Sequence, residues 1–172
     1  MGFPFTFTTE IQKINSALWN YVIFVPENVS QFCVETSIKR LVCTLNDEIS
    51  FQCALTPYGN NIWYIHLSAK IRKQLSLKEG SKVSVNLVKD TSEYGLPMPE
   101  EFREVLYSDE EGNQYFHALT PGKQRSLLYI AANVKSIDLR IKRAIVIIEH
   151  LKMMNGKIDF KKLNQMMKSK NN

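Results

Sequence analysis

The sequence predicts an α+β protein in which a small closed β-barrel of about six strands is followed by a C-terminal helical unit. Three observations support this fold class. Before residue 90, apolar residues alternate with polar ones in short runs, as in half-buried strands. After residue 99, apolar residues recur at helical spacing behind helix-start residues. Between the two, residues 90–99 carry two prolines, turn residues and little periodicity, which is typical of a linker.

The domain boundaries follow from these changes of pattern. A chain of 172 residues buries roughly 70% of its unfolded surface, so it needs no disulfide or metal to hold a core. The expected parts are a barrel domain at 1–90, a linker at 91–98, a helical unit at 99–156 and a basic tail at 157–172.

The first expected strands are followed by a short helix. Residues 5–9 alternate and predict one strand, and residues 18–25 predict a second. Pro26 ends the second strand. It also suits the first turn of a helix that reaches about Cys33, because proline is tolerated at the first helical position.

Residues 40–55 predict a hairpin whose register can be argued. The apolar residues of both strands are odd-numbered, so they share one buried face only when the loop has an odd number of residues. We expect a three- or five-residue or bulged turn at residues 46–48. Asn46 or Asp47 should be left-handed, because the turn has no glycine. The alternating residues are Leu41, Cys43, Leu45, Ile49, Phe51, Cys53 and Leu55.

The rest of the barrel reads as a strand, a short helix and a final strand. After a turn at residues 58–61, residues 62–67 are almost continuously apolar, which predicts a central strand. Ser68 can cap a helix, Gly80 suits a tight turn, and residues 82–89 alternate. This helix–turn–strand unit resembles that of cradle-loop barrels, such as AbrB-like swapped-hairpin barrels. The resemblance implies a swapped-hairpin homodimer as one alternative.

Helix-start residues divide the C-terminal half. Pro99 is followed by two acidic residues, which suit the first turn of a helix. Residues 109–112 should break that helix, and residues 114–119 should form a further helical turn. Thr120 followed by Pro121 predicts the next start, with a cap and then proline at the first helical position.

The last long helix has a predicted cap at each end. Ser136 precedes it, and Asn155-Gly156 should end it, because glycine is favoured just after a helix. Residues 157–172 form either a short docked helix or a frayed tail. The apolar stripe expected to face the core consists of Ile137, Ile141, Ala144, Ile145, Ile148 and Leu151.

Charge is unevenly distributed along the chain. The formal net charge is +5, yet residues 1–120 hold ten Lys/Arg against fourteen Asp/Glu, and residues 121–172 hold twelve against three. The C-terminal third is therefore strongly basic, which allows nucleic-acid phosphate or anionic lipid as a partner. On this count the barrel reads as acidic.

Several classes are disfavoured by composition. No apolar run is long enough for a transmembrane segment, and the first residues lack the features of a signal peptide. Three cysteines without ligand spacing indicate buried thiols in a reducing, cytoplasmic setting. The three histidines lie in separate elements without a nucleophile motif or phosphate loop, so we expect a non-enzymatic protein without cofactor or metal.

Two groups of residues are candidate sites. Four basic residues of the last two long helices form a candidate anion site; the alternative is a solvated face tied to Asp90 or Asp138 by ion pairs. Four aromatic residues of the barrel form a candidate pocket; the alternative is plain barrel core. The first group is Arg125, Lys135, Arg140 and Arg143, and the second is Trp19, Tyr21, Trp63 and Tyr64.

The order of motifs along the whole chain resembles the bacterial YdeI/OmpD-associated, or bacteriocin-protection, family, with its N-terminal barrel of unknown function. The resemblance implies a link to envelope stress or toxic peptides without an established reaction. The family's acidic-Thr-Arg triplet reads Asp138-Leu139-Arg140 here, so the threonine is absent. The motifs are Val25-Pro26, YGN with WYIHL, IRKQL with EGSKVSV, Pro97 with Pro99, FHALTPGKQRSLLYI, Asn133-Val134-Lys135 and RIKRA.

Three functions remain open at this point. The first is a binding module for an unknown small molecule or peptide, with the aromatic pocket as its site. The second is a nucleic-acid-binding protein that uses the barrel and the basic C-terminal helices. The third is association with a membrane surface through the basic, Met-rich stretch of residues 160–170.

Overall fold

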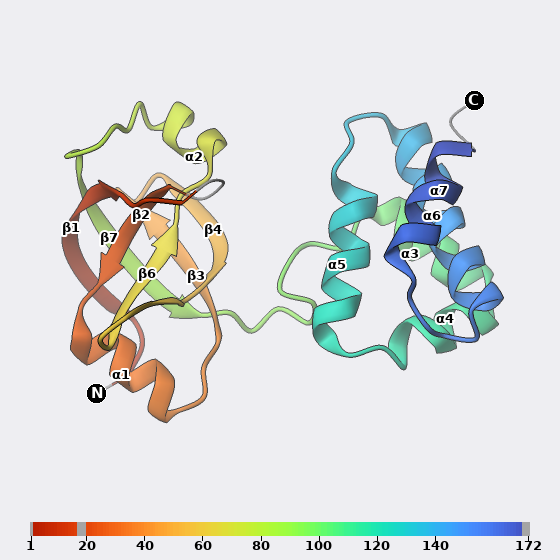
Figure 1. Cartoon of the computed structure of the whole chain (residues 1–172), viewed down its shortest axis with the longest axis horizontal. Coiled ribbons are helices and arrows are strands. Elements are labelled where there is room, and N and C mark those ends of the chain that lie inside the picture. Colours follow the sequence, from red (N-terminus) through yellow and green to blue (C-terminus); the bar gives the residue numbers. More distant parts are fainter. Residues whose placement is uncertain (1, 17–19, 170–172) are drawn as a thin grey trace. The chain divides into compact units, whose positions relative to one another are not determined.

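The computed structural model describes residues 2–16 and 20–169 and has two compact units, Met1–Thr91 and Ser92–Asn172. The first contains the strands, and the second contains only helices among its described residues (Figure 1). The predicted α+β class is confirmed. The division falls next to the predicted end of the barrel domain at residue 90.

Seven antiparallel strands of the described residues form one curled sheet in the first unit, with a helix at each end (Figure 1). Helix α1 leads from β2 to β3, and helix α2 leads from β6 to β7. The strands are β1 Phe5–Lys13, β2 Tyr21–Val25, β3 Arg40–Leu45, β4 Ile49–Ala54, β5 Thr56–Gly59, β6 Ile62–His66 and β7 Lys82–Lys89; the helices are α1 Glu27–Glu35 and α2 Ala69–Gln74.

The strand order is β4-β3-β7-β1-β2-β6-β5. The sheet has one strand more than the predicted six, namely β5. Its sequence begins with Thr56-Pro57 and lacks the apolar–polar alternation by which the other strands were predicted. The edge strands β4 and β5 follow each other in the chain with only Leu55 between them. The sheet is therefore curled into a half-barrel, and full closure stays a prediction.

The predicted hairpin is confirmed in both register and turn. Leu41 pairs with Cys53 and Leu45 with Ile49, so residues 46–48 form a three-residue loop. Asn46 and Asp47 both have positive φ, at 52° and 56°. The Asn46 side chain also accepts a hydrogen bond from the Ser84 amide at 3.0 Å, which fixes the loop against β7.

The predicted helix–turn–strand unit is confirmed as well. The Ser68 hydroxyl accepts from the Ile71 amide at 3.3 Å and caps α2. Gly80 has a φ of 79°, which favours glycine. Along β7 the buried residues are Val83, Val85 and Leu87.

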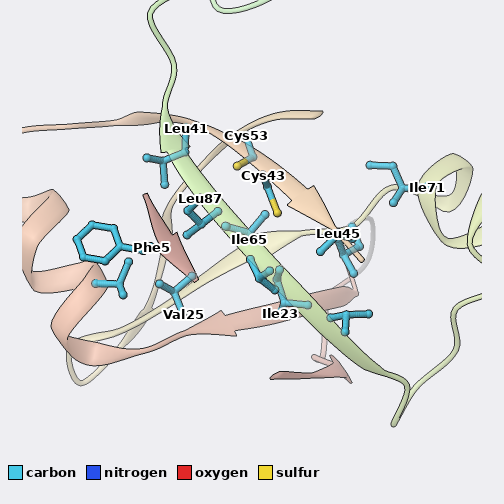
Figure 2. Close-up of a cluster of buried hydrophobic side chains, with 14 of the residues drawn as sticks. Phe5, Ile23, Val25, Leu41, Cys43, Leu45, Cys53, Ile65, Ile71 and Leu87 are labelled. Atoms are coloured by element: carbon cyan, nitrogen blue, oxygen red, sulfur yellow. The ribbon is translucent and has the colours of Figure 1, made fainter. Parts of the chain in front are cut away.

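The core of the first unit lies inside the curled sheet. Figure 2 shows residues from β1, β2, β3, β4, β6, α2 and β7 converging there, with Cys43 and Cys53 among them. All three cysteines are buried and unpaired. Most of the buried residues of this core come from the alternating positions on which the strand predictions rest.

The second unit is a bundle of helices around α6. Helix α3 ends at Ser108 and α4 begins at Glu110, so the expected break at residues 109–112 is shorter than predicted. The Asp109 carboxylate accepts from the Gly112 amide at 2.8 Å and starts the new helix at once. The helices are α3 Glu100–Ser108, α4 Glu110–His117, α5 Pro121–Ala132, α6 Ile137–Met153 and α7 Phe160–Ser169.

The predicted apolar stripe of α6 is wrong in its first half. Ile137, Ile141 and Ile145 are 59%, 38% and 39% exposed. The buried residues of α6 all lie between positions 144 and 151, so the second half of this helix supplies its contacts with the core. The buried residues of α6 also include Val146 and His150, which the predicted apolar stripe did not contain.

Helix α7 decides between the two alternatives for the C-terminal segment. Leu163 is fully buried, and Met166 and Met167 pack against the same core. The Asp159 amide donates to Nε2 of the buried His150 at 3.1 Å. Over its described residues the segment is therefore a docked helix.

Candidate functional site

Arg140, in the predicted anion site, is bound inside the helical unit. Its Nη2 and Nε donate to Oε1 of Glu101 at 2.7 and 2.9 Å. Its Nη1 donates to the backbone carbonyls of Val134 and Lys135 at 3.3 and 3.1 Å. The acidic partner is thus Glu101 rather than Asp90 or Asp138, and the guanidinium ties α3 to the start of α6.

The other three basic residues of that group do not face a common point. Arg143 Nη1 donates to the Ile130 carbonyl at 2.7 Å and satisfies the end of α5. Arg125 Nε donates to the Tyr94 carbonyl at 3.0 Å. Lys135 is exposed in the connection between α5 and α6. Three of the four side chains therefore hold backbone in place.

The structure also separates the candidate pocket residues. Trp63 and Tyr64 are consecutive in β6, so they project from opposite faces of the sheet. Tyr21 and Val25 project from the same face of β2, and Val25 pairs with Trp63. Tyr21 is four residues from Val25, so it lies about 13 Å from this pair along the strand. Trp19 lies outside the described residues. The three described side chains do not line one cavity.

Tyr21 instead lies at the centre of a cationic cluster. The guanidinium carbon of Arg72 is 3.7 Å from the centroid of its ring. The Lys13 ammonium lies over the same ring at 5.9 Å. A cation stacked on a tyrosine is attracted by the negative face of the ring and is held in a fixed orientation.

Local structure brings these three residues together. Lys13 and Tyr21 are cross-strand partners in β1 and β2. The Leu67 amide donates to the Tyr21 carbonyl at 2.9 Å, which places the start of α2 beside the ring. The Ser68 cap then sets the direction in which Arg72 leaves α2.

Two further cations lie on the same helix as Arg72. Lys70 and Lys73 are exposed on α2, and with Arg72 they make no ion pair within residues 2–16 and 20–169. We call the group of Lys13, Tyr21, Lys70, Arg72 and Lys73 the basic end of the first unit. A shallow depression adjoins it at Lys13, lined by Lys13, Ile14, Asn15, Ser16, Asn20 and Glu79.

Electrostatic perturbation is visible at the basic end. His66 ends β6 near Arg72; its pKa is lowered, first by burial and then by the Arg72 charge. Nε of Arg72 is buried and makes no hydrogen bond within the described part of the chain. The His66 imidazole is thus kept neutral. The positive charges of the basic end come from its lysines and Arg72.

The charge of the first unit corrects the prediction from the sequence. Residues 1–91 hold nine Lys/Arg against seven Asp/Glu, a net charge of +2, so the barrel is not acidic. The acidic excess of residues 1–120 comes from residues 93–111, which hold seven acids and one arginine. The negative stretch belongs to the linker and the first helices.

Among the described residues, no group of three His, Cys, Asp or Glu side chains could hold a metal ion. None of the helices in this part of the chain is both long and apolar enough to cross a bilayer.

Comparison with known families assigns both units. Residues 7–87 match the model of a domain of unknown function, DUF1905. Residues 96–153 match the family described as bacteriocin-protection, YdeI or OmpD-associated. Each match covers less than half of the chain and falls within one unit. The resemblance noted in the sequence is confirmed, and the DUF1905 domain is the one that carries the basic end. No curated protein matches the sequence.

Sequence reasoning missed the basic end of the DUF1905 domain in part. The cations of α2 were visible as the IRK stretch, but nothing in the sequence pairs Lys13 with Tyr21 across two strands. In the YdeI/OmpD-associated domain, helical spacing placed Arg140 and Arg143 on one helix. It gave no indication of their acceptors in α3 and α5.

Proposed function

We propose that this chain is a non-enzymatic binding protein that takes a phosphate-bearing ligand at the basic end of its DUF1905 domain. The observation that supports it is the Arg72 guanidinium stacked on Tyr21 at 3.7 Å, among exposed lysines. Stacking uses the face of the guanidinium and leaves donors at its edge for an anion.

The arrangement suits phosphate for two physical reasons. A planar guanidinium donates two parallel hydrogen bonds to phosphate oxygens, and such charge-assisted bonds are about twice as strong as neutral ones. Because the ring already holds Arg72 in place, less side-chain entropy is lost on binding. Lys13, Lys70 and Lys73 raise the local potential that attracts anions.

Inorganic polyphosphate is the probe for this proposal, since it offers phosphate groups without bases or sugars. We expect the full chain to bind it at about 50 mM salt and to lose affinity as salt rises. Arg72→Ala should weaken binding by about 10- to 100-fold, the range for a hydrogen bond to a charged group. Arg72→Lys should recover only part of this, because it keeps the charge but not the planar fork.

A charge-matched control separates a site from a general attraction. Lys13→Ala with Arg72→Ala removes two positive charges at the basic end. Lys39→Ala with Lys89→Ala removes two from the opposite end, because Lys89 pairs with Leu41 next to α1. Equal losses in the two double variants, or no binding by the wild-type chain, contradict the proposal.

The cellular setting belongs to the same proposal. The second family's description concerns protection from bacteriocins, and we place the binding activity in that context and in the cytoplasm. The three unpaired, buried cysteines support a reducing compartment. A swapped-hairpin homodimer stays a prediction.

A further inference from the structure

Three aromatic side chains form a cluster on the outer face of the DUF1905 domain. Phe24, Tyr58 and Tyr64 come from β2, β5 and β6. Their ring centroids are 5.3 Å apart for Phe24–Tyr58, 6.3 Å for Phe24–Tyr64 and 6.1 Å for Tyr58–Tyr64. We call these three residues the aromatic patch.

Strand alternation places the aromatic patch outside the sheet. Ile23, Val25 and Ile65 belong to the core, so their neighbours Phe24 and Tyr64 project from the opposite face. Phe24 pairs directly with Tyr64. Tyr58 is 55% exposed, which is unusual for a ring that has two aromatic contacts.

The rings are fixed without being covered. All three pairs meet edge to face, with interplanar angles of 75°, 75° and 81°. This geometry is favourable for aromatic pairs and holds each ring in one orientation. The ring of Tyr58 is therefore exposed to solvent while two aromatic contacts favour one orientation.

Of the basic end, only Tyr21 lies on a strand of the aromatic patch, and its parity places it with Ile23 and Val25 on the face opposite Phe24. Tyr21 begins β2, and His66 ends β6 next to α2. Val22 pairs with His66, and Phe24 pairs with Tyr64 two residues further on, which is about 7 Å along the strands. His66 has the parity of Tyr64 and lies near enough to Arg72 for that charge to lower its pKa, so a chain-like ligand that contacts Arg72 reaches Tyr64 past His66, at the end of the strands.

We propose that single-stranded nucleic acid binds over the end of β2 and β6, with bases stacked on the aromatic patch and phosphates on the basic end. This inference rests on the proposed phosphate-binding function and names its ligand. Aromatic rings next to a cationic groove are what single strands need, because unpaired bases expose π-faces and the backbone is a polyanion. A duplex keeps those faces stacked internally, so it gains nothing from the patch.

The test uses the full chain and a fluorescent oligothymidylate of about 12 nucleotides, a length within the usual range of site sizes. Tyr58→Ala with Tyr64→Ala should weaken oligonucleotide binding by about 5- to 100-fold. The same variant should bind polyphosphate as the wild type does. Tyr58→Phe with Tyr64→Phe keeps both rings and should bind oligonucleotide normally.

Salt and strandedness give two further readouts. Three or four phosphate contacts to a single strand predict a loss of about 20- to 50-fold between 50 and 200 mM salt. An unlabelled duplex of the same length should compete poorly. Equal competition by the duplex overturns the inference.

The outcomes separate this inference from the proposed function. Polyphosphate binding that depends on Arg72, with oligonucleotide binding that ignores the loss of both tyrosine rings, overturns the inference and leaves the proposed function standing. Oligonucleotide binding that requires the rings but not Arg72 also overturns the inference, and the proposed function is then judged by polyphosphate binding alone. The single variant Tyr58→Ala changes an exposed residue and should fold normally. A loss of oligonucleotide binding in this variant is then not caused by misfolding.

Discussion

Cys43 and Cys53 illustrate how surroundings set the chemistry of a single side chain. Burial raises the pKa of both thiols, and for Cys53 it does so to about 12. The nearby Arg40 charge lowers the Cys53 pKa less than burial raises it. Because the thiolate is the reactive form, both groups are chemically inert in the folded protein.

Thiol labelling tests this inertness. In native protein at pH 8, Ellman's reagent should react with the three cysteines at least about 100-fold more slowly than in guanidinium chloride, since burial suppresses both access and ionisation. Val34→Cys supplies a control, because Val34 is 52% exposed and the new thiol should react rapidly. Rapid native labelling of the wild type would contradict the burial of these thiols.

His150 predicts a pH dependence of stability. Its Nε2 accepts the Asp159 amide, and its pKa is lowered chiefly by burial, with Asp159 raising it and Lys162 lowering it. The unfolded chain therefore takes up the proton first, at a pKa of about 6.5. The contribution of the neutral ring is complete above that pH and is lost as pH falls through 6.5 toward the lower folded value.

The measurement is the free energy of unfolding between pH 7.5 and 5. It should fall with pH in the wild type and more gently in His150→Gln, where no imidazole titrates. His66→Gln serves as a comparison, because the His66 pKa is also lowered, but in the other unit. An unchanged slope in His150→Gln would show that this ring is not responsible.

At the scale of elements, α4 and α6 are in contact through a glycine. A Cβ at Gly112 would collide with Cγ2 of Ile148. We expect Gly112→Ala to lower the free energy of unfolding by about 1–3 kcal/mol, as overpacking does, although alanine favours helices. Gly122 in α5 has open space around it, so Gly122→Ala should stabilise by about 0.4–1 kcal/mol. Denaturant titrations of the pair decide this.

Arg143 joins α6 to the last turn of α5. Arg143→Ala leaves the Ile130 carbonyl without its donor and should cost about 1–3 kcal/mol of stability. Arg140→Ala leaves Glu101 without its cation and should also destabilise. Neither change should alter polyphosphate affinity, because the proposed phosphate site lies in the other unit. A variant that loses polyphosphate affinity but keeps its stability would show that the substituted arginine belongs to the binding site.

Elements set by local chemistry could be predicted, and elements set by neighbours could not. The 46–48 loop and β7 follow from alternation and from turn residues such as Gly80. By contrast, β5 contains Pro57, and its strand form comes from pairing with β6. The exposure of Ile141 depends on where other helices stop covering α6, which no pattern within α6 records.

At the scale of the whole molecule, the net charge is informative only when it is counted for each unit separately. A count over residues 1–120 merges a barrel of net charge +2 with the acidic residues 93–111 and conceals the basic end. Four basic residues of the C-terminal third were predicted as a site because Arg140 and Arg143 are three residues apart on one helix, with Arg125 and Lys135 expected on the preceding one. In the structure, Arg125, Arg140 and Arg143 hold backbone or carboxylate groups, whereas Arg72 is held on a ring.

The single-residue link at Leu55 has a consequence for proteolysis. It connects the two border strands of the sheet, so one stretch of backbone restrains both borders. A nick there would give each of these two edge strands a free chain end, and each could then separate from the sheet and pair with another chain. An intact Leu55 link therefore limits aggregation through both edges of the sheet.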